Sequence, residues 1–313
     1  MTTVSSVAEF VQQITELDHS LIRDGGPNNE TLLFRGQSNK AYDLLPSIAR
    51  KQKIACDISI FTEERNMIEM AKYKLPNVFN DSLSPIELLA LLQHHGIPTR
   101  LLDITENALV ALYFACAGNA GADGEVIVFK TNELDVANYP IVNAIADSYR
   151  FARATFLELS LFYDAVKRQP YFLEQAQSNG ICHKTDKEGD KEGDKEGDKE
   201  GGQWIEECCK DPFFIYAPVR EMRQQAQQGR YILFPNHIEH DQMSFCSYID
   251  KIEKDADFIA GRILVAGSVK EKILKELALF GITKETLFCD SVDVVCESIK
   301  GKFEQKVRGQ KQW

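Results

Sequence analysis

The sequence predicts an α/β protein of the α+β type, in which a mixed β-sheet is flanked by helices within a single domain over residues 1–313. Three observations support this fold class. Hydrophobic residues make up 44% of the chain, which is enough for a sizeable core. Segments with helical spacing and short apolar runs both occur, so helices and strands are both expected. The two kinds of segment do not alternate strictly, which favours a mixed sheet over a doubly wound parallel one.

The first helix and the first strand are marked by their apolar residues. Apolar side chains recur at helical spacing between Val7 and Leu17, which predicts an amphipathic helix. The apolar run at residues 32–34 predicts a buried strand that ends at Arg35 and Gly36.

Capping signals mark the next elements. The sequence SPIE at residues 84–87 is a capping box with proline at the first helical position, so a helix should begin there and end at Gly96. The apolar segment at residues 108–116 predicts another helix, with Thr105 as its N-cap. A strand is expected over residues 126–129.

The second half of the chain continues the mixture of helices and strands. A long helical region is expected at about residues 141–168, and the sequence SVKE at residues 268–271 predicts a capped helix that ends at Gly281. Further strands are expected at residues 213–216, 231–234 and 263–265.

One low-complexity segment lies inside the predicted domain. The unit DKEG occurs four times between Asp186 and Gly201, and glycine at every fourth residue opposes a helix. Since no residue of the unit suits a core, residues 184–203 are predicted to be a solvated loop inserted in the domain.

Charge and missing sequence signals exclude several classes of protein. The formal net charge of −11 repels a phosphate backbone, so nonspecific nucleic-acid binding is not expected. The chain shows no signal-peptide pattern and no apolar run of about 20 residues, so we expect no membrane contact and a cytoplasmic location. The eight cysteines include no C-x-x-C pair, and no metal site is predicted.

The densest polar stretch is QHHGIPTRLLDIT at residues 93–105, which is expected to connect two helices. In a functional interpretation, Arg100 binds a phosphate or carboxylate beside the N-terminus of the next helix. His94 or His95 then transfers a proton or forms a hydrogen bond. In a purely structural interpretation, Asp103 pairs with Arg100 and helps to cap the helix. The sequence favours neither interpretation.

Two further segments place polar groups beside predicted strands. An arginine at the end of a buried strand needs a partner, and Gly36 next to Arg35 lets a ligand or another backbone approach closely. The structural alternative is a salt bridge from Arg35 to Asp103 or to a glutamate. Residues 220–231 carry several glutamines and arginines, which can recognise a ribose or a base edge; a solvated glutamine-rich helix is the alternative.

Several motifs spread along the chain form a joint pattern. They are FRGQ at residues 34–37, LPSI at 45–48, HHGIPTRLLDIT at 94–105, ALYFA at 111–115, RQQAQQGRY at 223–231 and FGITKETLF at 280–288. With these motifs the chain resembles the FRG domain family of bacterial proteins, which is named after its Phe-Arg-Gly start. Ile104 stands where the family commonly has tryptophan, and Asn107-Ala108 where it often has Ser-Pro, which changes the packing beside the loop.

A weaker similarity is to ADP-ribosyltransferase folds, and it implies an NAD-using transferase that acts as a toxin or antiviral effector. The implied ligand is a nucleotide or NAD, and the implied acceptor is a protein or RNA. The implied catalytic residues are Arg35, His94, Thr105 and Gln227. The implied cofactor-binding residues are Arg35, Gly36, Gln37, His95, Arg100, Asp103, Tyr113 and Arg223.

The chain departs from the transferase pattern at one position. The glutamate expected on a late strand is missing near Gln227, although Glu221 lies nearby in the sequence. This departure leaves a second hypothesis open, in which the same pocket binds a nucleotide or regulates without turnover. A nucleic-acid hydrolase is least favoured, because the chain is acidic and has no clear carboxylate cluster for metal-assisted cleavage.

Overall fold

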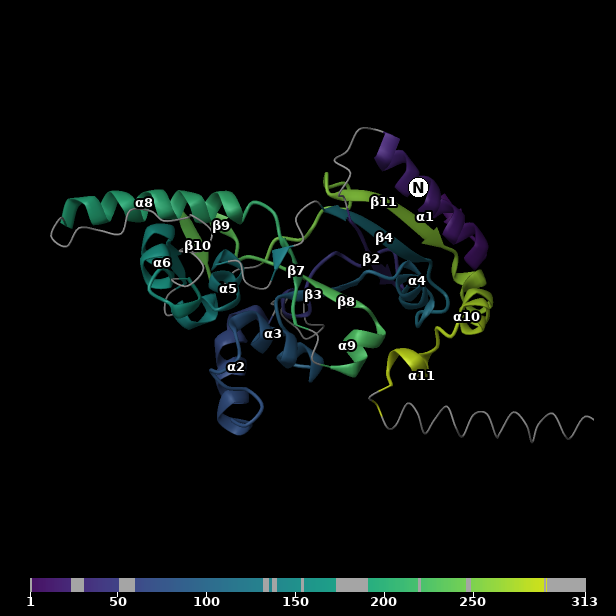
Figure 1. The fold of residues 1–313 in the computed structure, drawn as a ribbon, viewed down its shortest axis with the longest axis horizontal. Coiled ribbons are helices and arrows are strands. Elements are labelled where there is room, and N and C mark those ends of the chain that lie inside the picture. The colour runs from purple at the N-terminus through teal and green to yellow at the C-terminus, as the bar shows by residue number, and fades with distance from the viewer. Residues whose placement is uncertain are drawn as a thin grey trace, which may run out of the picture.

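The computed structural model describes most of the chain, and Figure 1 shows its arrangement. The described residues are 2–23, 31–50, 60–131, 135–136, 140–152, 155–172, 191–218, 221–245, 249–289 and 291. Their strands form an eight-stranded sheet and a separate three-stranded sheet.

The large sheet is mixed, as the sequence predicts. Its two outermost pairs, β1 with β11 and β5 with β7, are parallel, and the other neighbours are antiparallel. In sheet order the strands are β1 (Thr2–Val4), β11 (Ile259–Val265), β4 (Gly124–Thr131), β2 (Thr31–Gln37), β3 (Leu101–Thr105), β8 (Gly229–Leu233), β7 (Phe213–Tyr216) and β5 (Asp135–Val136). The small sheet consists of β6 (Phe156–Glu158), β10 (Gln242–Ser244) and β9 (Ile238–Glu239).

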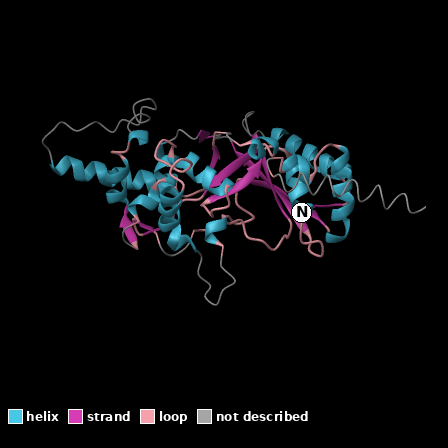
Figure 2. Cartoon of the chain, turned by 90° about the horizontal axis from the view of Figure 1, so that it is seen from below, coloured by secondary structure: helices cyan, strands magenta, loops and turns pink. Residues whose placement is uncertain are grey.

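Helices gather in two groups on either side of the strands (Figure 2). The described α-helices are α1 (Val7–Arg23), α2 (Glu64–Lys74), α3 (Pro85–His94), α4 (Ala108–Cys116), α5 (Pro140–Ala146), α6 (Leu159–Val166), α8 (Lys191–Cys208), α9 (Met222–Ala226), α10 (Lys270–Leu279) and α11 (Lys284–Leu287). Short 3-10 turns are η1 (Ser47–Ala49), η2 (Ile60–Glu63), η3 (Ser148–Phe151) and η4 (Gly267–Val269).

The buried side chains form three cores around the large sheet. Strand alternation sends Ile127 and Leu102 to a core that covers one face of the sheet. The opposite face carries two cores, one under α1, α4 and α10 that includes Val128, and one under α3, α5 and α6 that includes Leu101. Asp103 and Thr105 of β3 alternate with Leu102 and Ile104, so they lie on the same face of the sheet as Leu101.

Several elements agree with the sequence prediction. Ser84 caps α3 in a capping box with Glu87, and Gly96 with φ +82° follows the helix end. The helix at residues 108–116 and the strand at residues 213–216 have the predicted bounds. Strand β2 is longer than predicted and runs through Arg35 to Gln37, because it stays paired with β4 over that length.

The long helical region expected at residues 141–168 is wrong as a single element. Helix α5 ends at Ala146, η3 follows, and β6 interrupts the region before α6 begins at Leu159. The interruption comes from tertiary pairing, since β6 forms a ladder with β10, whose Ser244 pairs with Phe156. A distant strand here overrides the local helical pattern.

The loop predicted at residues 184–203 is wrong for residues 191–203, which belong to helix α8; residues 184–190 lie outside the described residues. Helix α8 packs along α6, and its glycines permit the contact. A Cβ at Gly202 would lie 3.0 Å from the amide nitrogen of Ser160, and one at Gly201 would overlap the ring of Tyr163. With Ile205 fully buried behind them, helix packing outweighs the low helical propensity of glycine.

The capping box predicted at Ser268 is also wrong. Ser268 lies inside η4, so the N-cap position of α10 falls on Val269, which makes no side-chain capping bond. A capping box does occur one helix later, where the Thr283 side chain accepts from the Thr286 amide at the start of α11. The end of α10 agrees with the prediction, because Gly281 with φ +76° follows it.

Asp147 should make stability depend on pH. Burial raises the pKa of its carboxyl to about 6, although Arg150, whose Nε donates to it at 2.6 Å, acts in the opposite direction. Because an unfolded aspartate has a pKa of about 3.9, the folded protein holds this proton more tightly, and its stability should fall as pH rises from about 4 to about 6. The expected fall is on the order of 1–3 kcal/mol.

Urea unfolding of the parent and of Asp147→Asn at pH values across this window measures the effect. The asparagine protein should lose the downward slope, since it has no proton to release at this position. Parallel stability profiles for the two proteins would contradict the assignment to Asp147.

Candidate functional site

A cavity opens where two central strands of the large sheet separate. The ladder between β2 and β3 contains the single pair Phe34 with Thr105. Beyond it, β2 stays paired with β4 as far as Gln37, while β3 stays paired with β8 as far as Leu101. The cavity at this opening has a volume of about 240 Å³.

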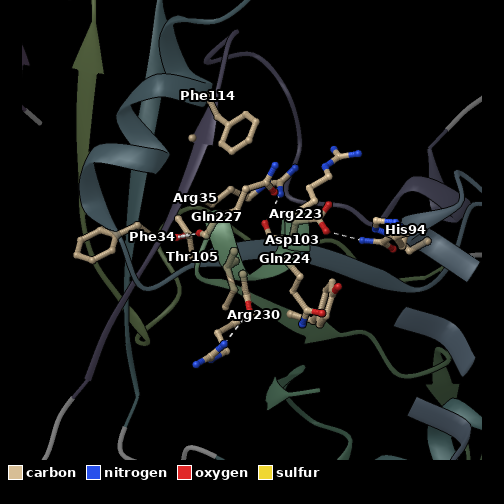
Figure 3. A pocket seen from close by; sticks show the side chains of 15 residues that line it. Phe34, Arg35, His94, Asp103, Thr105, Phe114, Arg223, Gln224, Gln227 and Arg230 are labelled. Carbon is tan, nitrogen blue, oxygen red and sulfur yellow. Dashed lines mark hydrogen bonds between the residues drawn. The ribbon is translucent and has the colours of Figure 1, made fainter. Parts of the chain in front are cut away.

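Three segments far apart in the sequence, together with Phe114 of α4, line this cavity (Figure 3). Residues 34–36 come from β2. Residues 93–94 come from the end of α3 and residues 103–105 from β3. Residues between 223 and 231 come from α9, β8 and the turn that joins them. The structure therefore brings together the three polar segments of the sequence. The middle segment is not simply a connection between helices, because it contains strand β3.

Arg35 spans the opening between the strands. Its Nη1 donates to the main-chain oxygen of Asp103, so a guanidinium replaces the strand amide that would otherwise bind there. Its Nε is buried and has no hydrogen-bond partner in the described part of the chain. Desolvation lowers the pKa of the Arg35 guanidinium to about 10, against the effect of the Asp103 charge, so Arg35 stays cationic at neutral pH.

Helix α9 adds two further donor groups. The amide nitrogen of Gln224, Nε2, is buried without a hydrogen-bond partner among the described residues. The guanidinium of Arg223 lies over the ring of Phe288, 4.4 Å from its centroid. The cavity is thus lined by donors and positive charge from two sides of the opening.

Acidic and hydroxyl groups are also present. The carboxylate of Asp103 accepts from Nε2 of Gln93 at 2.8 Å. Nε2 of His94 lies 3.6 Å from a carboxylate oxygen of Glu221, a residue just outside the cavity lining. Burial and the charge of Asp103 raise the pKa of Tyr231, so its hydroxyl keeps its proton at neutral pH. Asp103 and Tyr231 therefore add a carboxylate and a phenolic hydroxyl to the lining of the cavity.

Thr105 and Gln227 were both expected to be catalytic. Both line the cavity, but their side chains form hydrogen bonds with main-chain groups of the protein. Oγ1 of Thr105 donates to the main-chain oxygen of Gln227 at 2.7 Å and accepts from the amide of Asn107 at 3.0 Å. Nε2 of Gln227 donates to the main-chain oxygen of Leu287 at 3.0 Å. Thr105 is not the N-cap of α4, because the chain extends two residues further and Asn107 caps the Leu109 and Val110 amides.

Arg100 lies away from the cavity, contrary to its expected role in cofactor binding. It is fully buried and pairs with Glu64, whose Oε1 accepts from its Nε at 2.8 Å. Its Nη1 donates to Oδ1 of Asn236 at 2.7 Å. The predicted structural pairing with Asp103 is wrong as well, because the Arg100 guanidinium binds Glu64 and Asn236, whereas the Asp103 carboxylate accepts from Gln93.

Three other predicted binding residues do not line the cavity. Gln37 is buried, with 4% of its surface exposed, and Tyr113 packs in the core under α4 with its ring against Phe114. His95 is exposed, and its ring lies edge-on to Phe79. Gln37 and His95 are sequence neighbours of lining residues, and Tyr113 was implied by the transferase similarity, but the periods of the strand and helices direct their side chains elsewhere.

Gly36 lines the cavity and also contacts helix α4. A Cβ at this position would overlap the carbonyl oxygen of Ala111 and lie 2.7 Å from the amide nitrogen of Ala115. Of the two neighbours expected beside Gly36, a ligand or another backbone, the structure places the backbone of helix α4 there.

From the sequence, Gln224 was included only as part of a candidate segment and Phe114 was not assigned to the site, although both line the cavity. Gln224 lies in the RQQAQQGRY motif and Phe114 in the ALYFA motif, yet nothing in the sequence distinguishes Gln224 from its exposed neighbour Gln225. Arg230 also lines the cavity, but Glu106 accepts from its Nε at 3.1 Å and from its Nη2 at 2.9 Å, so most of its donors are already used.

The described residues contain neither a metal-binding cluster nor a membrane-spanning helix. No group of three or more histidine, cysteine, aspartate or glutamate side chains there could hold a metal ion. Among the helices described, none combines the length and apolar character needed to cross a bilayer.

Comparison with known proteins gives one match. Residues 30–124 match the family model of the FRG domain, from just before β2 to the first residue of β4. No curated protein and no solved structure matches the chain significantly.

Proposed function

The chain carries an FRG domain at residues 30–124, and we propose that the cavity between its β2 and β3 binds a small phosphate-bearing nucleotide. One observation carries this proposal. Nε of Arg35 and Nε2 of Gln224 are buried donors that have no hydrogen-bond partner among the described residues, and both residues line the same cavity. A buried donor left unsatisfied costs about 1–3 kcal/mol, and a ligand rich in acceptor oxygens removes that cost.

The charge of the donors favours an anionic ligand. Two cationic side chains line the cavity, Arg35 from strand β2 and Arg223 from helix α9. They concentrate positive charge there, although the chain as a whole carries a net charge of −11. Charge-assisted bonds from guanidinium to phosphate are about twice as strong as neutral ones. The half-exposed ring of Phe114 offers a surface against which a planar base can pack.

The size of the cavity limits what it can enclose. Its volume of about 240 Å³ is below the range of about 300–1,000 Å³ typical of pockets that bury a drug-sized ligand. One nucleotide unit is the matching size, and the second half of a dinucleotide such as NAD would extend out of the opening.

Calorimetric titration of the full chain with AMP, NAD, adenosine and inorganic phosphate tests the proposal. AMP or NAD should bind, and adenosine, which lacks phosphate, should bind at least about 10-fold more weakly. Gln224→Leu should weaken nucleotide binding by about 10-fold and should leave the free energy of unfolding unchanged or higher, because it removes an unpaired buried amide.

Gln225→Leu is the matched control, since Gln225 is the exposed neighbour on the same helix. It should bind AMP or NAD like the parent. Arg35→Ala should lose about 100-fold in affinity, which corresponds to the loss of a charged hydrogen-bonding group. Equal binding by Arg35→Ala, or adenosine binding as tightly as AMP, would exclude the proposal.

A second candidate is the transfer of ADP-ribose from NAD, and the carboxylates at the site favour it. Asp103 lines the cavity, and Glu221 pairs with the cavity residue His94 at 3.6 Å. In such a reaction the bond between the ribose C1′ and the nicotinamide nitrogen breaks, and nicotinamide leaves with the electron pair. The acceptor's nucleophile then bonds to C1′ and gives up its proton, and a carboxylate stabilises the oxocarbenium between these events.

Incubation of the purified chain with labelled NAD and a cell lysate separates the two candidates. Transfer of label to protein or RNA, or release of nicotinamide, supports the transferase, and the loss of both in Glu221→Gln would assign the carboxylate. Binding of NAD without any product supports a module that binds without turnover.

A further inference from the structure

Two arginines that line the cavity each place their guanidinium over an aromatic ring, but the N–H groups of the two guanidiniums differ in their hydrogen-bond partners. Arg230 lies over the ring of Tyr216, 4.3 Å from its centroid, and Arg223 lies over Phe288 at 4.4 Å. The donors of Arg230 are used by Glu106 and by the main-chain oxygen of Gly229. The Arg223 guanidinium makes no hydrogen bond or ion pair to other described residues, so within that part of the chain its face is covered by the Phe288 ring and its N–H edges have no acceptor.

The ring over Arg223 is held by helix α11. The Thr283 capping box starts this helix, and Leu287, with 3% of its surface exposed, anchors it in the core under α4. The bond from Gln227 to the Leu287 carbonyl ties α11 to the end of α9. Phe288 follows directly and also packs edge-on against Phe114, at 6.2 Å between centroids. The ring position is therefore set by several independent contacts.

We propose that Phe288 is a positioning residue that holds the guanidinium of Arg223 with its donor edges directed to the phosphate of the bound nucleotide. This inference rests on the proposed nucleotide binding. A long arginine side chain loses rotamer freedom when it binds a ligand, and a ring that already restricts it reduces that loss. Helices α9 and α11, both outside residues 30–124, would then complete an anion site that β2 begins with Arg35.

A double-mutant cycle on AMP binding tests the inference. Phe288→Leu should weaken AMP binding by about 5- to 10-fold, and Phe288→Tyr should restore it, because tyrosine keeps the aromatic face. In the Arg223→Ala background, Phe288→Leu should have no further effect, since the group it positions is gone. Tyr216→Leu is the matched control, and its affinity should stay unchanged because Glu106 already holds Arg230.

A second measurement does not need a ligand. Relaxation of the Arg223 Nε–H group by NMR should show larger picosecond-to-nanosecond motion in Phe288→Leu than in the parent or in Tyr216→Leu. Additive losses in the cycle, an equal loss in Tyr216→Leu, or unchanged Arg223 motion would each overturn the inference. If the parent binds no nucleotide, the proposed function fails, and the NMR comparison alone then decides whether Phe288 orders Arg223.

Discussion

Arg100→Met is expected to lower the free energy of unfolding by about 3–5 kcal/mol, because it leaves the Glu64 carboxylate buried without its counter-charge. Arg100 is fully buried and Glu64 is 5% exposed, so water cannot replace the lost partner. The change also removes the donor that Asn236 accepts from at 2.7 Å. Chemical denaturation of the parent and the variant measures the difference.

Two comparisons identify the cause. The double variant Arg100→Met with Glu64→Leu should recover much of the loss, since an apolar pair of similar volume often replaces a buried ion pair at little cost. Arg168→Met removes an exposed pair, in which Asp164 lies 2.7 Å away, and should cost less than about 1 kcal/mol. A double variant that is less stable than Arg100→Met alone would contradict the ion-pair explanation.

Gly36→Ala is expected to destabilise the protein by about 3 kcal/mol or more, or to prevent its folding. The added Cβ would overlap the Ala111 carbonyl and lie 2.7 Å from the Ala115 amide, and both belong to the backbone of α4. A backbone cannot move aside as a flexible side chain can, so strand β2 and helix α4 would have to separate. Thermal and chemical denaturation measure the loss.

Gly121→Ala is the matched control, because a Cβ at Gly121 has no heavy atom within 4 Å. Its stability should stay close to that of the parent. If Gly36→Ala were equally well tolerated, the packing of β2 against α4 would be looser than the structure shows.

The motif FRG at residues 34–36 thus combines three separate tasks. Phe34 packs under α4, Arg35 spans the opening between β2 and β3, and Gly36 admits helix α4 to the sheet. Ligand binding is proposed to depend directly on Arg35 alone among the three. A change at Gly36 should therefore reduce binding only together with stability, whereas Gln224→Leu should reduce binding without a loss of stability.

The sequence alone was sufficient for features that depend on neighbouring residues. The capping box at Ser84, the glycine that ends α3 and the apolar run of β4 each involve groups a few positions apart, and all three agree with the structure. The mixed sheet also followed from the order of helical and strand patterns. The polar segments that line the cavity were recognisable by their density of charged and amide groups.

The tertiary structure alone decided which of these polar groups have partners. Arg100 and Arg35 both lie at buried strands. Nε of Arg100 donates to Glu64, 36 positions away in the sequence, whereas Nε of Arg35 has no acceptor among the described residues. Helix α8 likewise depends on its contact with α6 and not on the composition of its repeats. Hydrogen-bond partners and packing surfaces come from distant parts of the chain. The spacing of residues within one segment does not determine which distant groups will contact it.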